Sequence, residues 1–409
     1  MKYLKQIVGI DVARNELVVT LGRMREDLSI ELCARKTFAN DKNGFWSLVC
    51  WAKKLTDSSV SVRFVMEATG AYHELLAYYL VERGDEVSII LPSKISNYVR
   101  TLETKTVTDK TSADAIARFG LERQLDRWRR PSLVYATLRQ LTRERNQLLD
   151  EQTVAKNQLH AELAGALVNK QSVKRLEERL ALCERQSKEI VAELSAVVKA
   201  DKKVGEQVVL LCSIPGIGFL TAVTLLGETN GFDLIRNKRQ LTSYAGLDVR
   251  EKQSGTSVKG QSRISKRGNK HIRKALYFPA LAAIRCDERY KSLYHRILSR
   301  TGKRMKGAVA VQRKILEMAY TVFSTGVRYD KQYLAKQEAQ ATAAQSQATQ
   351  AAQEKVAGQP TEEVSTVAAT SPAAAAEPSV VTEEPQSKGM IRKEKNILQL
   401  VRKAELVEQ

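Results

Sequence analysis

The chain has 409 residues, a formal net charge of +20 and a pI of about 9.7. This length exceeds one ordinary hydrophobic core, so it predicts two or three domains. Hydrophobic residues make up 43% of the chain and charged residues 27%, which is typical of a globular protein. Since no apolar run reaches the ~20 residues of a membrane helix, we expect no membrane partner.

The first residues, MKYLKQIVGIDVARNELVV, alternate charged and apolar positions and lack a small-residue cleavage site, so they do not predict a signal peptide. Four histidines without a Cys-x-x-Cys motif argue against zinc. The cysteines are odd in number, scattered and mostly in apolar runs, which suggests reduced core thiols: Cys33, Cys50, Cys183, Cys212 and Cys286.

The positive charge is spread unevenly along the chain. Residues 337–387 hold seven Glu and one Lys, a net of −6, so the remainder carries +26. A basic surface binds phosphates through counterion release, largely without regard to sequence. Nucleic acid is therefore the expected partner, although charge alone also fits a generally basic protein.

The first 125 residues predict an α/β domain. Strand-like runs occupy 5–12, 16–22, 28–33, 61–66 and 86–91, the last of them ended by Pro92. Helices are expected at 42–55, before Gly84 and from near Ser112. The order β-β-β-α-β-α-β-α predicts a mixed sheet with helices packed against it.

Residues 131–198 have a long-period helical pattern. Apolar positions recur at alternating three- and four-residue spacings, interrupted by one serine: Leu176, Leu180, Cys183, Ser187, Ile190, Leu194 and Val197. The segment LAGALVNKQSV predicts a turn and hence an antiparallel helical hairpin. An ordinary helical subdomain and an intermolecular coiled coil fit this pattern equally well.

Four acidic residues mark element ends in the first 115 positions. Asp11 and Glu67 end strand-like runs, Asp109 is expected in a loop, and Asp114 in the first turn of a helix. Carboxylates are the hard oxygen ligands that Mg²⁺ prefers, and a metal pair can hold both oxygens of a phosphodiester displacement. Asp109 alone could be a turn residue and Asp114 a helix-dipole partner. The ordered set of four favours an enzyme that breaks and rejoins DNA.

Two later segments predict contacts with phosphates. In IPGIGFLTA, Gly216 and Gly218 form a turn into a helix whose N–H groups could face a phosphate, although tight helix packing is the commoner reason for such a turn. In the block that follows, we expect three serines to make only structural hydrogen bonds: Ser257, Ser262 and Ser265. The block is dense in glycines and cations: Arg250, Lys252, Lys259, Arg263, Lys266, Arg267, Lys270, Arg273 and Lys274.

Residues 206–330 are mostly helical in pattern, whereas 337–387 lack periodicity and cannot bury enough apolar surface to fold. The final IRKEKNILQLVRKAEL predicts a short basic amphipathic helix.

Several motifs resemble insertion-sequence transposases of the IS110 family, over roughly residues 5–125 and 205–325. They are IVGIDVARNELVV, FVMEATGAYH and TDKTSADAIARFG, then LCSIPGIGFLTAVTLLGE and LTSYAGLDVREKQSGTSVKGQSRISKRGNKHIRKAL. The resemblance implies an RNase-H-fold, RuvC-like DEDD domain at 1–128, a helical hairpin or coiled coil at 129–204 and a mostly helical transposase domain at 205–332. A disordered acidic linker at 333–388 and a short helix at 389–409 would follow.

The resemblance also implies chemistry and partners. Ser254, in an S-G-x-x-x-x-G setting, matches the family's nucleophile, and Asp11, Glu67, Asp109 and Asp114 match its Mg²⁺ ligands. Expected partners are donor and target DNA, a structured non-coding guide RNA and further copies of the chain in a tetramer, in the bacterial cytoplasm at the nucleoid. One departure is that Asp109 and Asp114 are five positions apart, whereas the family usually spaces them by three.

Two other functions remain open at this level. A metal-dependent nuclease could hydrolyse branched DNA with water as nucleophile and would survive Ser254→Ala. A non-catalytic nucleic-acid-binding protein would keep its acidic set for structure alone and cleave nothing.

Overall fold

The computed structural model describes residues 3–68, 70–102, 106, 108–233, 235–251, 253–254, 258–260 and 262–332. The expected acidic linker and final helix lie outside the described residues. Within the described chain, no helix is both long and apolar enough to cross a membrane.

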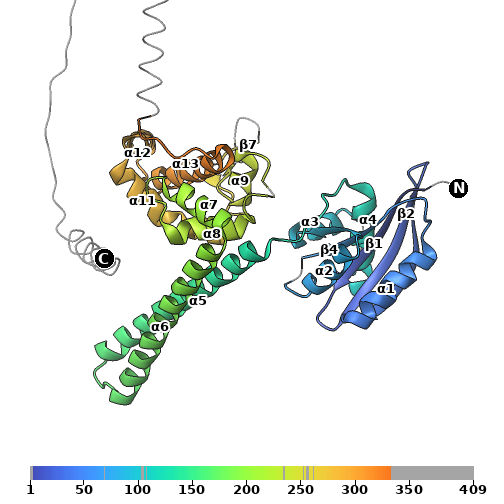
Figure 1. Ribbon diagram of the computed structural model, residues 1–409, viewed down its shortest axis with the longest axis horizontal. Helices are drawn as coiled ribbons and strands as arrows, with labels where there is room; N and C mark the ends of the chain where they lie inside the picture. The colour runs from blue at the N-terminus through green and yellow to red at the C-terminus, as the bar shows by residue number, and fades with distance from the viewer. Residues whose placement is uncertain are drawn as a thin grey trace, which may run out of the picture. The chain divides into compact units, whose positions relative to one another are not determined.

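The N-terminal domain is built on a five-stranded sheet in the order β3-β2-β1-β4-β5 (Figure 1). The neighbours β1, β2 and β3 pair antiparallel, whereas β4 runs parallel to both β1 and β5. This mixed sheet confirms the predicted RuvC-like fold class. Its strands are β1 (Tyr3–Val12), β2 (Glu16–Arg25), β3 (Ile30–Ala39), β4 (Val62–Glu67) and β5 (Glu86–Ile90).

Alternation along β1 divides the sheet into two buried faces. Val8 and Ile10 belong to a core with side chains of α1 (Lys42–Leu55) and α2 (Glu74–Glu82). Ile7 belongs to the opposite core, with side chains of α3 (Pro92–Val99) and α4 (Asp109–Glu122). Odd-numbered residues of β1 therefore face α3 and α4, because successive side chains of a strand point to opposite faces.

Several predicted boundaries were wrong. Pro92 does more than end a strand, since it is the first residue of α3, where its fixed φ suits a first turn. Thr108 caps α4, so Asp109 is the first helical residue rather than a loop residue, and Asp114 lies beyond the first turn. β3 continues to Ala39 along the sheet edge. Cys33 and Cys286 are exposed, so they are not core thiols.

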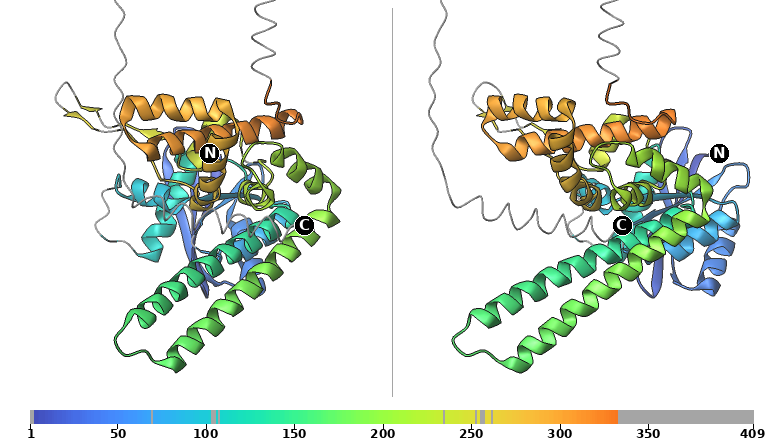
Figure 2. Two further views of the ribbon diagram at one scale, coloured as in Figure 1. Left: turned by 90° about the vertical axis from the view of Figure 1, so that its left-hand side faces the viewer. Right: turned by 60° about the vertical axis from the view of Figure 1, so that its left-hand side comes forward.

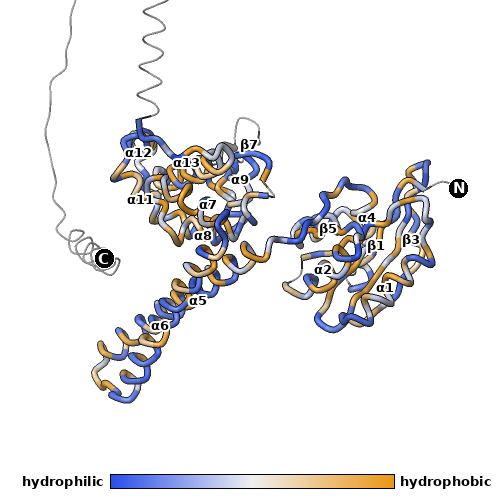
Figure 3. Tube along the Cα trace, in the orientation of Figure 1, coloured by the Kyte–Doolittle hydropathy of each residue, from blue (hydrophilic) through white to orange (hydrophobic). Residues whose placement is uncertain are grey.

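The predicted helical hairpin is formed by α5 (Leu133–Ala164) and α6 (Lys170–Ala200), which run side by side in Figures 1 and 2. Cys183, Ile190 and Leu194 of the predicted seam are buried, and Val198 is buried in place of Val197. Orange and blue alternate along both helices in Figure 3, as expected of helices that bury only one side.

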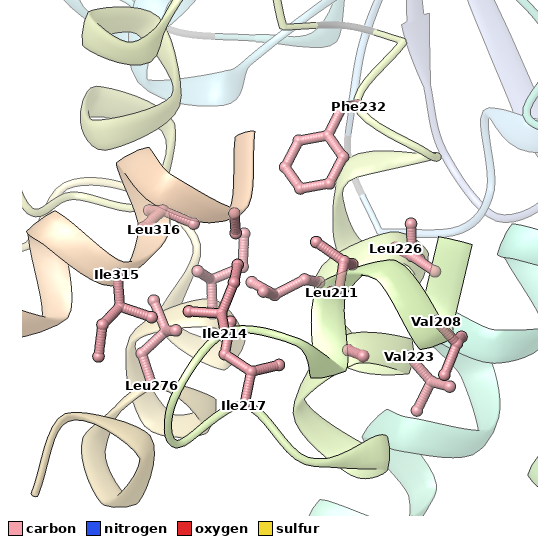
Figure 4. Close-up of a cluster of buried hydrophobic side chains, with 14 of the residues drawn as sticks. Val208, Leu211, Ile214, Ile217, Val223, Leu226, Phe232, Leu276, Ile315 and Leu316 are labelled. Carbon is pink, nitrogen blue, oxygen red and sulfur yellow. The ribbon is translucent and has the colours of Figure 1, made fainter. Parts of the chain in front are cut away.

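The C-terminal domain is a group of helices around one core. Figure 4 shows Leu211 between Val223 on one side and Leu316 on the other, three residues that come from separate helices. Two short hairpin-like pairs lie between these helices in the sequence: β6 (Val249–Arg250) with β9 (Arg263–Ile264), and β7 (Gln253–Ser254) with β8 (Val258–Lys259). The helices are α7 (Lys202–Cys212), α8 (Phe219–Thr229), α9 (Lys238–Tyr244), α10 (Lys270–Ala275), α11 (Tyr277–Cys286), α12 (Glu288–Thr301) and α13 (Arg304–Thr325).

Candidate active site

Asp11 and Glu67 lie next to each other at the end of the sheet. In the parallel pairing of β1 with β4, Ile10 is opposite Met66, so the next step of the register sets Asp11 opposite Glu67. Neighbouring strands are ~4.8 Å apart. Asp11 is four residues after Ile7 and Glu67 is two residues after Val65, so each points to the same face of the sheet as that residue. Ile7 and Val65 are buried against α3 and α4. Their carboxylates therefore belong to the face that α4 covers.

Two glycines let α4 lie directly on this face. A Cβ at Gly9 would approach the Ala117 backbone nitrogen to 2.4 Å, and one at Gly120 would lie 2.9 Å from Ile7. Gly120 thus lies over the start of β1, and Ala117 over its middle. The N-terminal end of α4, with Asp109, therefore points toward the strand end that carries Asp11.

The three carboxylates act on one another electrostatically. Burial, followed by the nearby negative charges of Asp109 and Glu67, raises the pKa of Asp11 to about 6. Carboxylates that repel each other in a partly buried place favour a bound cation, which lowers the charge they share. All these donors are oxygens, the ligand type of Mg²⁺ and similar hard cations. Their chemistry fits a divalent metal, although within the described ranges no three Asp, Glu, His or Cys side chains lie close enough to form a ready-made metal site.

Asp114 has different partners. Its Oδ1 and Oδ2 accept from Nε and Nη2 of Arg35, both at 2.7 Å, and Oδ1 also accepts from the Thr20 hydroxyl at 2.8 Å. Five residues along a helix correspond to a rotation of ~140°, so Asp114 leaves α4 on another side than Asp109. The structure thus places Glu67 and Asp109 near enough to Asp11 to affect its charge, and it pairs Asp114 with β2 and β3.

We expect Asp109→Asn to reduce DNA cleavage by about 100-fold or more, because it removes a negative charge from the trio. Asp114→Asn should change the free energy of unfolding by less than ~1 kcal/mol, since the Arg35 side chain is 54% exposed. Cleavage rates and urea unfolding of both variants test this, with Asp27→Asn on an exposed turn as the control. A similar loss of cleavage in Asp114→Asn is expected if Arg35 releases Asp114 to complete the set of four carboxylates, and unchanged cleavage would mean that the metal needs only the other three.

Asn40 ties together two loops beside the trio. Its Nδ2 donates to the carbonyl of Ala13 at 2.9 Å and to that of Tyr72 at 3.3 Å. The first carbonyl follows β1 and the second lies in the turn before α2, so one side chain fixes the segments after both acidic strand ends. Sequence reasoning missed this residue.

Ser254 lies in β7, and its backbone pairs with Val258 of β8. For Ser254 and Lys259 only the backbone is described, and Lys252 lies outside the described residues. The exposed cations of the predicted block are Arg250, Arg263, Lys266, Arg267, Lys270 and Lys274. These cations lie on the same stretch of chain as Ser254, some before it and some after it. The block therefore presents a basic surface near the predicted nucleophile in the sequence.

Arg273 and Gly216 have structural contacts. The Nη1 of Arg273 donates to the carbonyls of Ala245, at 2.7 Å, and Gly268, at 3.1 Å, and so fixes the turn before α10. Gly216 has φ +87°, and a Cβ there would lie 2.2 Å from the carbonyl oxygen of Pro279. Packing therefore explains Gly216, whereas Gly218 is exposed at the start of α8. Ser265 bonds to Asp248, as expected of a filler serine.

A buried carboxylate anchors this basic block, and sequence reasoning missed it. Glu228 in α8 is 3% exposed and accepts from Arg143 of α5 through both oxygens, at 2.7 and 2.8 Å. It also accepts from Nδ2 of Asn269, the N-cap of α10, at 2.6 Å. Burial alone would raise the pKa of Glu228, but these hydrogen bonds hold it below its ordinary value. An N-cap asparagine was the one signal visible in the sequence.

Two family models match parts of this chain. A family model for the DEDD domain of IS110 transposases matches residues 8–168, and the model of the IS116/IS110/IS902 transposase family matches residues 208–295. The pilin gene-inverting protein of Moraxella bovis is 28% identical over 334 residues, which cover 80% of this chain and 98% of that protein.

Two further similarities are shorter. The transposase for insertion sequence element IS1111A of Coxiella burnetii is 33% identical over 97 residues, 24% of this chain and 26% of that one. The solved structure of T. thermophilus RuvC in complex with Holliday junction substrate has 9% sequence identity and a TM-score of 0.24, over 30% of this chain and 99% of that chain.

Proposed function

Because this chain belongs to the IS110 family of DEDD transposases, we propose that it cleaves and rejoins DNA through a covalent phosphoserine at Ser254. The observation that supports the metal-dependent part is that Glu67 and Asp109 lie near enough to Asp11, at one end of the sheet, to raise its pKa. The similarity to a pilin gene-inverting protein supports DNA inversion as an additional outcome of the same strand exchange.

The family implies a divalent metal, and we propose Mg²⁺ held by Asp11, Glu67 and Asp109. Asp114 completes the set of four when Arg35 releases it. When bound, the metal would neutralise charge on the attacked phosphate and favour loss of the serine proton. The carboxylates would position the cation, and α4 covers this face of the sheet beside them.

Ser254 supplies the nucleophile. Its Oγ forms a bond to phosphorus while the bond from phosphorus to the 3′-oxygen breaks, and the serine proton balances the released 3′-hydroxyl. A 3′-hydroxyl from the exchanged strand then attacks the phosphoserine and returns the Ser254 hydroxyl. One phosphoester is present at every stage, so rejoining needs no nucleoside triphosphate.

Nucleic-acid partners follow from the charge and the chemistry. The exposed cations from Arg250 to Lys270 would hold donor and target DNA by their phosphates. We further propose that a structured non-coding RNA selects both sequences and that four copies of the chain assemble, because two duplexes must be cut. The hairpin of α5 and α6 is a candidate contact between copies.

Trapping the covalent species tests this function. Full-length protein is mixed with Mg²⁺, RNA transcribed from the flanks of the element and a nicked DNA that loses its exchange partner. We expect a DNA–protein adduct on a denaturing gel and a phosphonucleotide on Ser254 by mass spectrometry. The adduct should be absent in Ser254→Ala and in Asp11→Ala, whereas Ser262→Ala serves as the matched control and should retain it.

Cleavage without an adduct, retained in Ser254→Ala, would replace this function with hydrolysis by an activated water. DNA binding without any cleavage, unchanged in Asp11→Ala, would indicate a protein that only binds nucleic acid.

A further inference from the structure

A hollow of about 570 Å³ lies beside the segment that carries Ser254. Its walls come from β6, β9, α12 and α13. The floor is aliphatic and includes Leu247, Ile264, Ile297 and Val309. At its edge Val249 is 52% exposed and Met305 is 57% exposed, so the apolar floor continues onto the open surface.

Cations surround this apolar floor. Arg263 and Lys266 approach from the β9 side, and Arg300 and Lys306 from α12 and α13. A fifth, Arg313, forms an ion pair with Glu317 at 3.0 Å. Among the residues that the structure describes, it is the one lining cation in an ion pair. The remaining charges can therefore bind an anion without first breaking an internal contact.

The hollow is close to Ser254 along the chain. Val249 pairs with Ile264 and Arg250 with Arg263, so β6 and β9 form both the wall of the hollow and the base of the segment between them. Ser254 follows Arg250 by four residues, a reach of at most ~14 Å. Successive nucleotides of a DNA strand rise ~3.4 Å, so this reach covers about four nucleotides.

We propose that this hollow binds one unstacked nucleotide of the DNA strand that Ser254 attacks, within about four nucleotides of the scissile phosphate. The inference rests on the proposed function of Ser254. The base lies on the aliphatic floor, and its flanking phosphates contact Arg300 and Lys306 on one side and Arg263 and Lys266 on the other.

The chemistry of the lining favours a nucleotide over other anions. A free phosphate would use the cations but leave the apolar floor in water, and paired duplex would hide its bases within the stack. An unstacked base presents a flat apolar face with a phosphate on each side, which matches both features. Holding that base would also fix the strand position relative to Ser254.

Binding of abasic DNA tests this inference without requiring cleavage. The Ser254→Ala protein, full length, is titrated with a fluorescent nicked duplex in which each nucleotide from one to four steps on either side of the nick is made abasic in turn. We expect one position at which the abasic substitution weakens binding by about fivefold, the lower end for contacts between a base and a protein side chain. Substitutions at the other positions should have little effect.

Two variants connect that position to the hollow. Met305→Asp should remove the abasic effect, whereas Val327→Asp, at a residue that is 66% exposed and outside the hollow, should preserve it. The double variant Arg300→Gln and Lys306→Gln should lower the slope of log affinity against log salt by about 2. Its control, Arg296→Gln and Lys303→Gln, makes the same charge change on exposed residues outside the hollow.

The inference is wrong if no abasic position stands out, or if Met305→Asp leaves the effect intact. It is also wrong if the abasic effect appears only with an RNA strand, since the occupant would then be the guide. A missing adduct in the trapping experiment, together with a clear abasic position, would instead overturn the proposed role of Ser254 and leave the nucleotide site in place.

Discussion

Replacing Asp11 by Asn is expected to abolish cleavage and, at the same time, to stabilise the metal-free protein. The loss of cleavage should reach about 1,000-fold or more, because the residue sits at the centre of the carboxylate trio. The stabilisation follows from electrostatics: burial, Asp109 and Glu67 all disfavour the charged form of Asp11 and raise its pKa to about 6.

The pH dependence of this stabilisation has a definite sign. A raised pKa means that the folded state binds the proton more tightly than the unfolded state, so the favourable contribution is present at pH 4 and lost as the pH rises through 6. At pH 7 the wild type should therefore be less stable than Asp11→Asn by about 1 kcal/mol, once solvent screening of this part-exposed carboxyl is allowed for.

Thermal unfolding with and without Mg²⁺ measures this effect. Without metal, the midpoint of Asp11→Asn should exceed that of the wild type at pH 7 and match it near pH 4. Mg²⁺ should raise the wild-type midpoint and leave the variant almost unchanged. Asp41→Ala is a useful contrast, because Asp41 caps α1 and loss of this cap should destabilise the protein at every pH tested. A variant no more stable than wild type at pH 7 would contradict the proposed repulsion.

Sequence patterns correctly predicted that Asp11 and Glu67 lie at strand ends, because each follows an apolar run, and the alternation of side chains along a strand decides which face they share. The start of α4 was harder to predict. Thr108 and Thr111 form its capping box, whereas the usual signature has Glu or Gln at the third helical position. The helix was therefore expected near Ser112, which put Asp109 in a loop.

The partner of Asp114 could not be predicted from local sequence. Arg35 is 79 residues away, and it reaches Asp114 only because β3 continues past Cys33 and pairs Arg35 with Thr20. The five-residue spacing from Asp109 then turns Asp114 toward that strand. Ser112 occupies the position three residues after Asp109, where the family usually has its fourth acidic residue. The five-residue spacing between Asp109 and Asp114 therefore goes together with the ion pair between Asp114 and Arg35.

The largest stability effect outside the trio is expected at Glu228. Glu228→Ala should lower the free energy of unfolding of the C-terminal domain by about 3 kcal/mol, because it leaves Arg143 and Asn269 without their acceptor. The cost lies at the low end for buried ion pairs, since the Arg143 side chain is 45% exposed and water can solvate it. Glu228→Gln should cost less, because its amide oxygen can still accept one of these bonds.

Asp150→Ala is the matched control for Glu228→Ala. Asp150 also links α5 to α10, through Lys274 at 2.6 Å, but both side chains are largely exposed, so its loss should cost less than ~1 kcal/mol. Urea unfolding gives the two values, and trypsin cleavage between Arg263 and Lys270 reports local opening of the basic block. Because the Glu228 carboxylate holds the amide of Asn269, whose Oδ1 caps α10, trypsin should cut Glu228→Ala faster than Asp150→Ala. Equal cutting rates would mean that the block is held by Arg273 and its backbone contacts alone.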